Sequence, residues 1–460
     1  MDHFLAVDIG ASSGRHILGS IENEKLVLEE IYRFSNNVSK KEGSLVWDTD
    51  RLFREVIEGM KQAAHIGKIP KSMAIDTWAV DYMLLDEKDQ ELAPLYAYRD
   101  PGHAKGAEQF HKTIPFSALY ERNGLQYQPF NTIYQLASRP ETLKDAKHFL
   151  MVPDYLAWKL TGIKSNEYTN LSTTGLINVH SHDLDDSLLE QTKITNDLFG
   201  PVKIPGECIG PLSDEISGQV GYSCEVVACA SHDTASAFLA SIGEEIILSS
   251  GTWSLIGITT AQTHITEKAR NANFSHEGSF DRNFRFLKNI MGLWIIQEVR
   301  RDLNEQYSFA DLVKLAKADP YPYCFDVNKV RFLKPDCMSE EIKTECAALG
   351  YPPIESIGQL ADCVYRSLAL ATKTAVEELE SITQKAYATI NIVGGGSQNE
   401  YLNELIAEQT NKRIIAGPIE ATALGNIGAQ LMGAEKMKAK EIKELIRKSF
   451  PYKEYQGGRE

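Results

Sequence analysis

Hydrophobic and polar positions along the first half of this chain change repeatedly between two periods, which predicts alternating strands and helices. Residues 49–67 place their apolar side chains at helical spacing, with Asp48 to Asp50 at the N-cap and Gly67 at the end. A second, shorter helix is predicted at residues 153–161, with Pro153 in its first turn and Gly162 closing it. Short apolar runs predict strands at residues 4–10, 15–20, 27–34 and 72–75.

The second half repeats the same order of elements. It begins with two strands separated by a polar turn and continues with alternating helices and strands. The predicted strands are residues 246–248, 254–259, 389–393 and 413–416, and the predicted helices are 357–382, 399–410 and 420–432. Two similar α/β domains facing a cleft are therefore expected, 1–240 and 241–460, with the boundary between Leu239 and Glu245.

Composition agrees with this picture. The chain has 460 residues, more than one hydrophobic core usually supports, and 43% of them are apolar. Neither a membrane-spanning run nor a signal peptide is evident, and the seven cysteines form no C-x-x-C pair, which favours reduced thiols in a soluble, cytoplasmic protein. The net charge of −15 argues against nucleic acid and anionic membranes as partners. No obligatory protein partner is predicted.

Two polar turns in the middle of the chain are the strongest candidates for chemistry. Ser231-His232-Asp233-Thr234 follows a buried strand run, and a carboxylate there lies where open α/β sheets do chemistry. Ser249-Ser250-Gly251-Thr252 joins two strands, and its glycine and hydroxyls suit a phosphate. Taken alone, these residues fit two ordinary polar turns beside a helix start at Thr234 equally well.

Two further glycine-rich turns support a nucleotide site. Asp8 leads into the turn Ala11-Ser12-Ser13-Gly14, which Arg15 follows, and Gly394-Gly395-Gly396 lies between a strand and a helix. Three glycines leave no side chain between the backbone and a flat ligand, and a helix N-terminus adds amide donors. A plain tight turn is the alternative for the triple glycine.

Other motifs are weaker. Gly10 to Gly14 matches the G-x-S-x-G hydrolase pattern, but it precedes a strand where that motif requires a helix. Walker A and G-x-G-x-x-G patterns do not occur. His180 and His182 lie in a polar segment ahead of acidic residues, which favours an exposed loop over a metal site.

The ordered set of motifs resembles the FGGY carbohydrate kinases of the sugar kinase and actin-like ATPase superfamily. The matching segments, spread over nearly the whole chain, are residues 6–15, 75–81, 231–235, 249–254, 287–294 and 393–396. Two departures stand out. The letters F-G-G-Y occur nowhere, and Ala79 stands where the most similar members carry Gly, so an extra methyl would narrow a close backbone contact there.

The resemblance implies two actin-like (ribonuclease H-like) ATPase domains around a central cleft, the first with the sugar and one phosphate hairpin, the second with the other hairpin and the adenosine site. It implies that Asp233 is the catalytic base and that Asp8 holds Mg²⁺, through water. The implied sugar contacts are Ala79, His232, Asp233, Thr234 and Asn289. The implied ATP contacts are Ala11, Ser12, Ser13, Gly14, Arg15, Thr252, Gln297 and Gly395.

Each of these residues also has an ordinary structural interpretation. Asn289 and Gln297 could be polar residues beside an apolar helix start, Trp78 could be core rather than sugar platform, and His232 could be a satisfied core histidine. The expected reaction is ATP-dependent phosphorylation of a ketose, L-rhamnulose at its C1 hydroxyl, with L-fuculose or D-xylulose as alternative substrates. A non-catalytic sugar sensor on the same fold is the other alternative.

Overall fold

The computed structural model describes residues 1–243 and 245–458. Glu244, which belongs to the predicted boundary, and residues 459–460, which belong to the predicted second domain, lie outside the described residues. The chain forms two compact units. The first contains Met1–Ala240, Thr259–Phe286 and Ala421–Ser449, and the second contains Ser241–Ile258, Leu287–Glu420 and Phe450–Glu460. The single boundary at residue 240 stays a prediction.

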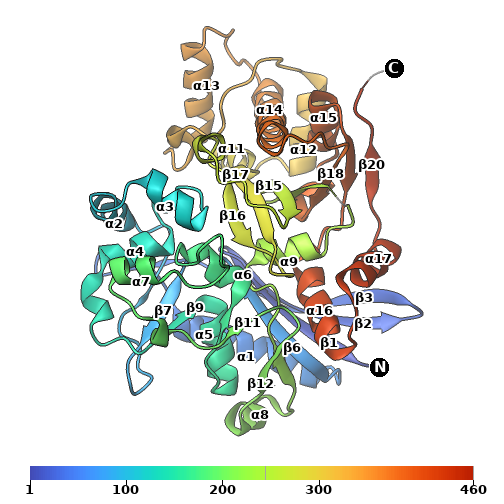
Figure 1. The fold of residues 1–460 in the computed structure, drawn as a ribbon. Coiled ribbons are helices and arrows are strands. Elements are labelled where there is room, and N and C mark those ends of the chain that lie inside the picture. The colour runs from blue at the N-terminus through green and yellow to red at the C-terminus, as the bar shows by residue number, and fades with distance from the viewer. Residues whose placement is uncertain (244, 459–460) are drawn as a thin grey trace. The chain divides into compact units, whose positions relative to one another are not determined.

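A six-stranded sheet is the centre of the first unit (Figure 1). Its strands, in spatial order, are β12 (Cys208–Pro211), β13 (Glu225–Val227), β6 (Pro70–Thr77), β1 (His3–Ile9), β2 (Ser13–Glu22) and β3 (Lys25–Ser35). β1 pairs antiparallel with β2 and parallel with β6, so Asp8 lies between Arg15 and Asp76 in the ladder. The sheet register therefore gathers these charged side chains at one end of three strands.

Helices cover both faces of this sheet. Leu5, Val7 and Ile9 alternate along β1 and join a core that includes residues of α1 (Thr49–His65) and α5 (Val152–Thr161). The predicted α1 is confirmed, because Asp48 caps it by accepting from the amide of Arg51 and its apolar stripe is buried. On the other face, α9 (Asp233–Leu239) and α16 (Ala421–Ala434) pack together and against β6.

Smaller elements complete the first unit. The short strands are β4 (Ser39–Lys41), β5 (Ser44–Trp47), β7 (Tyr82–Leu85), β8 (Leu95–Tyr96), β9 (His148–Met151), β10 (Asn166–Glu167), β11 (Val202–Lys203) and β16 (Ser275–Gly278). The remaining helices are α2 (His103–Phe110), α3 (Phe116–Asn123), α4 (Thr132–Ser138), α6 (Tyr168–Leu171), α7 (Asp186–Thr192), α8 (Asp214–Val220), α10 (Glu267–Asn271) and α17 (Ala439–Ser449).

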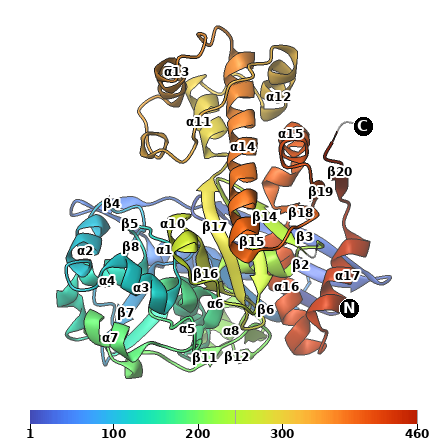
Figure 2. The same ribbon diagram turned by 45° about the horizontal axis from the view of Figure 1, so that its top comes forward.

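The second unit contains most of a seven-stranded sheet. Its order is β16, β17 (Phe284–Met291), β15 (Trp253–Thr260), β14 (Ile246–Ser250), β18 (Thr389–Val393), β19 (Arg413–Ala416) and β20 (Lys453–Tyr455). The helices are α11 (Trp294–Asp302), α12 (Phe309–Ala318), α13 (Met338–Ala348), α14 (Ile357–Thr383) and α15 (Glu400–Thr410). The long helix α14, which packs on α12 and α15, dominates the view in Figure 2.

The two sheets share one topology. In each, a central strand pairs antiparallel with the next strand of the chain and parallel with a later one: β1 with β2 and β6, and β14 with β15 and β18. The predicted duplication of an α/β unit is thereby confirmed. The predicted strand at 389–393 matches β18, and the helix predicted at 357–382 is α14.

Two details of the predicted turns differ in the structure. β14 continues to Ser250, so Ser249 and Ser250 belong to the strand rather than to the turn. After β18, a short 3₁₀ turn over Gly395–Gln398 comes before α15, because Gly394 adopts a left-handed φ of 83° that breaks the path of the chain.

All seven cysteines are free thiols. None of the helices in residues 1–243 and 245–458 combines the length and the apolar character that a bilayer span requires. 

Buried histidines make the stability of the first unit sensitive to acid. His16 on β2 is fully buried and donates to the carbonyl oxygen of Val56 on α1, 3.1 Å away. Gly59 makes room for the ring, because a Cβ there would lie 2.3 Å from it. Burial lowers the pKa of His16 to about 4, although the hydrogen bond to Val56 opposes the shift.

We expect acid to destabilise the fold partly through His16. Because the folded pKa is depressed, its contribution to stability is present above the unfolded pKa and is lost as the pH falls through the folded value. Between pH 7 and pH 5 this loss amounts to about 2 kcal/mol. Denaturant unfolding of wild type and His16→Gln at both pH values tests this. The variant should lose correspondingly less stability on acidification, and equal losses would contradict the assignment.

Candidate active site

The first predicted site element is the hairpin between β1 and β2. Residues 10–12 form the turn, and the amide of Gly10 donates to the carbonyl oxygen of Ser13 at 2.8 Å. Asn36 braces the turn by donating to Gly10 and to Ser12, with distances of 2.9 Å. The predicted ATP contacts Ala11, Ser12, Ser13, Gly14 and Arg15 therefore lie on one rigid hairpin.

Asp8 is the second-last residue of β1 and lies beside this hairpin. The guanidinium of Arg15 donates to its Oδ2 at 2.6 Å, and the Asp8 side chain is only 10% exposed. Arg15 thus neutralises part of the charge that a buried carboxylate carries.

Asp76 at the end of β6 is a second buried carboxylate next to Asp8. Asn426 of α16 donates to its Oδ2 at 2.6 Å, whereas Oδ1 has no hydrogen-bond partner among the described residues. Burial, followed by the charge of Asp8, raises the pKa of Asp76 well above the usual range. A ligand could form the hydrogen bond or metal contact that this buried oxygen lacks.

Asp233 is the first residue of α9, and His232 is its N-cap. Thr234 donates to Asp233 Oδ1 twice, from its amide at 2.5 Å and from its hydroxyl at 3.1 Å. His232 Nε2 lies 3.4 Å from the same oxygen, and the Asp233 side chain remains 33% exposed. The carboxylate is therefore held through one oxygen and open to a ligand at its surface.

Three carboxylates give this region a strong negative field. Burial raises the pKa of Asp233, the charge of Asp8 raises it further, and His232 opposes the shift. Asp233 in turn contributes to the raised pKa of Asp76. A carboxylate with a raised pKa is more basic and accepts a proton more readily near neutral pH. The arrangement therefore suits a general base.

A buried network fixes the backbone that carries Asp233. Oε2 of Glu167 accepts from the amide and hydroxyl of Ser231 at 3.0 and 2.7 Å, and from the Thr169 hydroxyl at 2.6 Å. Asn170 donates to the carbonyl oxygen of Ser231 at 3.2 Å, and the amide of Thr77 donates to the same oxygen at 2.9 Å. These bonds tie the segment before α9 to the end of β6.

Ala79 is half-buried and lies in a constrained turn after β6. The next residue, Val80, has a φ of 68°, which is rare for a β-branched side chain and stores strain. Hydrogen bonds from Thr132 at 2.6 Å and Gln135 at 3.2 Å hold its carbonyl oxygen. Trp78 is only 6% exposed and belongs to the hydrophobic core, so its ring is committed to packing.

In the second unit, the hairpin between β14 and β15 meets the start of α11. The amides of Leu293 and Trp294 donate to the carbonyl oxygens of Gly251 and Thr252 at 2.8 and 3.2 Å. The Thr252 hydroxyl lies 3.5 Å from Oε1 of Gln297 on α11. The structure thereby brings two predicted ATP contacts together.

The glycine turn after β18 lies beside this hairpin. β14 and β18 are paired, and a Cβ on Gly396 would lie 2.0 Å from the hydroxyl oxygen of Ser250. Gly395 is exposed, and a Cβ there would meet no atom within 4 Å. Gly396 is thus needed for packing, whereas Gly395 leaves an open surface on which a flat ligand can lie.

The predicted residues fall into two groups, one in each unit. Asp8, the β1–β2 hairpin, Ala79 and residues 232–234 lie in the first unit, whereas Thr252, Gln297, Gly395 and Asn289 lie in the second. Asn289 is on β17, and its buried Oδ1 has no partner among the described residues. Its contact with sugar stays a prediction.

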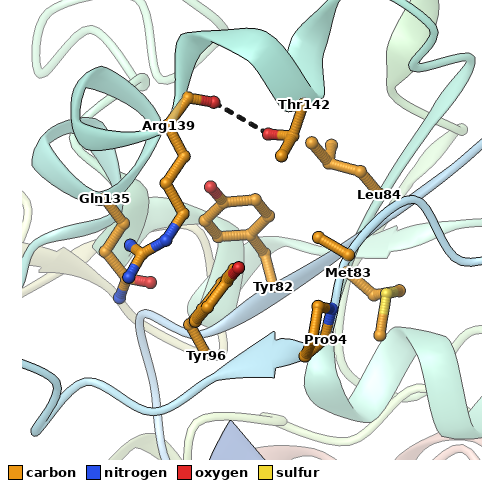
Figure 3. A pocket seen from close by; sticks show the side chains of 9 residues that line it. Tyr82, Met83, Leu84, Pro94, Tyr96, Gln135, Arg139 and Thr142 are labelled. Atoms are coloured by element: carbon orange, nitrogen blue, oxygen red, sulfur yellow. Dashed lines mark hydrogen bonds between the residues drawn. The ribbon is translucent and has the colours of Figure 1, made fainter. Parts of the chain in front are cut away.

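A separate small hollow in the first unit contains none of these residues (Figure 3). Arg139 and Tyr96 both line this hollow, and the guanidinium of Arg139 stacks on the Tyr96 ring with 3.6 Å between the guanidinium carbon and the ring centre. The lining residues are Tyr82, Met83, Leu84, Ala93, Pro94, Tyr96, Gln135, Arg139 and Thr142. Without a carboxylate or a glycine turn it offers no phosphate-transfer chemistry.

The carboxylates of the first unit fit a magnesium ion. Mg²⁺ prefers oxygen ligands, keeps several waters, and is usually bound by one or two carboxylates together with substrate phosphates. Asp8, together with the unsatisfied Oδ1 of Asp76, supplies such oxygens. In the described part of the chain no three His, Cys, Asp or Glu side chains form a metal-binding group.

Several residues around the site were not singled out by the sequence patterns. Asn426 reaches Asp76 from a helix 350 residues away, and Arg285 and Glu277 reach His232 from β17 and β16. The alternation Phe284-Arg285-Phe286, which puts a charge between two apolar positions, was the one local signal for Arg285. Long-range contacts of this kind have no signature in a single sequence.

Comparison with known proteins gives matches over nearly the whole chain. The model for the FGGY family of carbohydrate kinases, N-terminal domain, matches residues 3–240, and the C-terminal domain model of that family matches residues 246–434. A rhamnulokinase from Halalkalibacterium halodurans is 46% identical, covering 99% of both chains. A rhamnulokinase from Bacillus subtilis is 40% identical, covering 98% of this chain and 94% of the relative.

Solved structures with low sequence identity share the fold. A xylulose kinase from Lactobacillus acidophilus superposes with a TM-score of 0.82 at 18% identity, covering 100% of this chain and 94% of that structure. A Plasmodium falciparum glycerol kinase with ADP gives a TM-score of 0.78 at 14% identity, covering 100% and 95%. The predicted two-domain fold is confirmed by these likenesses.

Proposed function

The chain belongs to the FGGY family of carbohydrate kinases, and from this we propose that it transfers the γ-phosphoryl group of ATP to the C1 hydroxyl of L-rhamnulose. The observation that carries the choice of sugar is the near full-length identity of 38–46% with proteins named rhamnulokinase. We place the reaction in the cytoplasm, where ATP is present and the seven free thiols stay reduced. Neither nucleic acid nor a protein partner is needed.

In this proposal Asp233 is the general base. Its Oδ1 is held by Thr234, and its partly exposed carboxylate would face the substrate. The C1 hydroxyl oxygen bonds to the γ-phosphorus while the bond from that phosphorus to the β,γ-bridging oxygen breaks, and the hydroxyl proton passes to Asp233. Because the oxygen loses electron density late in the reaction, a carboxylate of modest basicity can accept that proton.

The remaining residues bind and orient. The rigid hairpin at Ala11–Arg15 and the turn at Thr252 would hold phosphates, and Gly395 would let adenosine lie on the backbone. Ala79, His232, Thr234 and Asn289 would contact the ketose. Mg²⁺, held by Asp8 through water with Asp76 nearby, would supply neutralisation of the phosphate charge.

A panel of ketoses in a coupled ATP turnover assay tests the choice of sugar. L-Rhamnulose ends in a methyl group at C6, for which the Ala79 side chain offers apolar surface. Apolar pockets discriminate single groups by roughly 10–200-fold, so we expect kcat/KM for L-rhamnulose to exceed that for D-xylulose, which ends at C5, by at least about tenfold. L-Fuculose carries the same C6 methyl and differs from L-rhamnulose in the configuration of one hydroxyl group, so its kcat/KM tests the hydroxyl contacts instead. Faster turnover of either alternative would assign a different sugar, and no turnover with tight sugar binding would indicate a sensor.

A further inference from the structure

A buried ion pair lies directly behind His232. Arg285 on β17 is 0% exposed and Glu277 on β16 is 6% exposed, and both belong to the same unit as His232. Nη2 of Arg285 lies 3.0 Å from His232 Nδ1 and 3.1 Å from Glu277 Oε2. Nε of Arg285 donates to the carbonyl oxygen of Gly278 at 2.9 Å, which fixes the plane of the guanidinium. 

This geometry determines which nitrogen of His232 carries the proton. A guanidinium has five N–H donors and no acceptor, so Arg285 bonds to Nδ1 only when Nδ1 has a free lone pair. The proton of the neutral ring must then be on Nε2. The competing arrangement, with Nδ1–H donating to Glu277 Oε2, has a longer separation of 3.4 Å and would place Nδ1–H against the guanidinium.

Glu277 is ionised and balances the buried cation. Burial alone would raise the pKa of Glu277, but its polar neighbours, among them the charged Arg285, lower it overall. An unpaired guanidinium at 0% exposure would be strongly unfavourable, so the carboxylate is what permits Arg285 to be charged at this position.

The other edge of His232 faces the proposed base. Nε2 lies 3.4 Å from Oδ1 of Asp233, the oxygen that also accepts from the amide and hydroxyl of Thr234. Within the described residues, every hydrogen bond to the Asp233 carboxylate ends on Oδ1. The second oxygen, Oδ2, is thereby left for a hydroxyl of the substrate.

We propose that Arg285, balanced by Glu277, is a positioning residue that fixes the Nε2–H tautomer of His232, directs this N–H to Oδ1 of Asp233, and so leaves Oδ2 to accept the proton of the sugar. The inference rests on the proposed role of Asp233 as base. Because Arg285 is 0% exposed, we infer that it acts through His232 and not by contact with a ligand. A wrong tautomer would turn a lone pair, rather than a donor, toward the carboxylate.

The tautomer can be measured directly in the unmodified protein. In ¹⁵N-histidine-labelled protein, long-range ¹H–¹⁵N correlation spectra distinguish a protonated ring nitrogen from one with a lone pair, and His232→Gln identifies the signals of His232 by their loss. We expect Nε2 of His232 to carry a proton and Nδ1 to carry a lone pair. A proton on Nδ1 would overturn the proposal, whatever the activity of the enzyme.

A double-mutant cycle tests whether Arg285 acts through His232. Arg285→Lys keeps the charge that Glu277 needs but loses the planar fork, and we expect kcat to fall about tenfold with the KM for ATP unchanged. Gln at position 232 places an amide N–H close to where Nε2–H was and has no ring tautomer. Adding Arg285→Lys to His232→Gln should therefore cost less than twofold further, whereas full additivity would contradict the mechanism.

A matched control separates this effect from general destabilisation. Arg122 of α3 forms an ion pair with the buried Asp185, the N-cap residue of α7, at 3.0 and 2.6 Å, although the Arg122 side chain is more exposed than that of Arg285. Arg122→Lys should leave kcat unchanged. If Arg285→Lys fails to fold, the tautomer measurement in the unmodified protein still decides the question.

The results that would contradict the proposed function differ from those that would contradict the role of Arg285. If Asp233→Asn retained activity, Asp233 would not be the base. The tautomer of His232 in the unmodified protein would still be a separate result. Faster turnover of another ketose would assign a different substrate. The double-mutant cycle would then be measured with that ketose, and the spectra of His232 would be interpreted in the same way.

Discussion

Asp233→Asn is expected to reduce kcat at least about a hundredfold while the protein stays folded and binds ATP and ketose with nearly unchanged Kd. Asn is almost isosteric with Asp, and its Oδ1 can still accept from the amide and hydroxyl of Thr234, so the start of α9 should be preserved. The amide nitrogen that replaces Oδ2 cannot accept a proton. A positioned base contributes roughly 10²–10⁴-fold to the rate, which sets the expected loss.

Single-turnover phosphoryl transfer, measured together with calorimetric binding of both ligands, separates chemistry from affinity. Asp214→Asn is the matched control, because Asp214 is also the first residue of a short helix, α8, and is exposed. It should leave kcat unchanged. A loss of less than tenfold in Asp233→Asn would mean that Asp233 is not the base, and Asp76 or Asp8 would then be examined.

The pH profile gives an independent check on the same residue. Burial and the charge of Asp8 raise the pKa of Asp233 above its ordinary range. Since the base must be deprotonated, kcat/KM should fall as the pH drops through that raised pKa, at a higher pH than an exposed aspartate would give. The residual activity of Asp233→Asn should lack this acid limb.

Gly395→Leu is expected to raise the KM for ATP on the order of a hundredfold and to leave the KM for the ketose within about twofold. A Cβ at Gly395 meets no atom within 4 Å, so a side chain can start there in open space. The leucine side chain would occupy the open surface on which adenosine is proposed to lie. The loss should therefore appear in ATP binding and not in folding.

Gly218→Leu provides the control, because Gly218 on α8 also has open space around its Cβ position. Its ATP kinetics should match wild type. Melting temperatures of both variants establish that they are folded. If folded Gly395→Leu bound ATP with unchanged affinity, adenosine would not bind at this turn.

The sequence determined the fold class and the chemical character of the site because both depend on local patterns. The period of apolar residues specified α1, β18 and α14, and the turn composition specified the two hairpins. Asp8 and Asp233 could be proposed because each occupies a turn that follows a strand run, where α/β sheets place functional groups. Each of these patterns is contained in a short stretch of the sequence.

Only the tertiary structure decided how these groups are held and charged. The raised pKa of Asp76 depends on burial and on Asp8, a neighbour created by the parallel pairing of β1 and β6. His232 lies 3.0 Å from Arg285, which is 53 residues away along the chain. Burial and electrostatic coupling are properties of distances in space, and a single sequence specifies those distances only after the chain has folded.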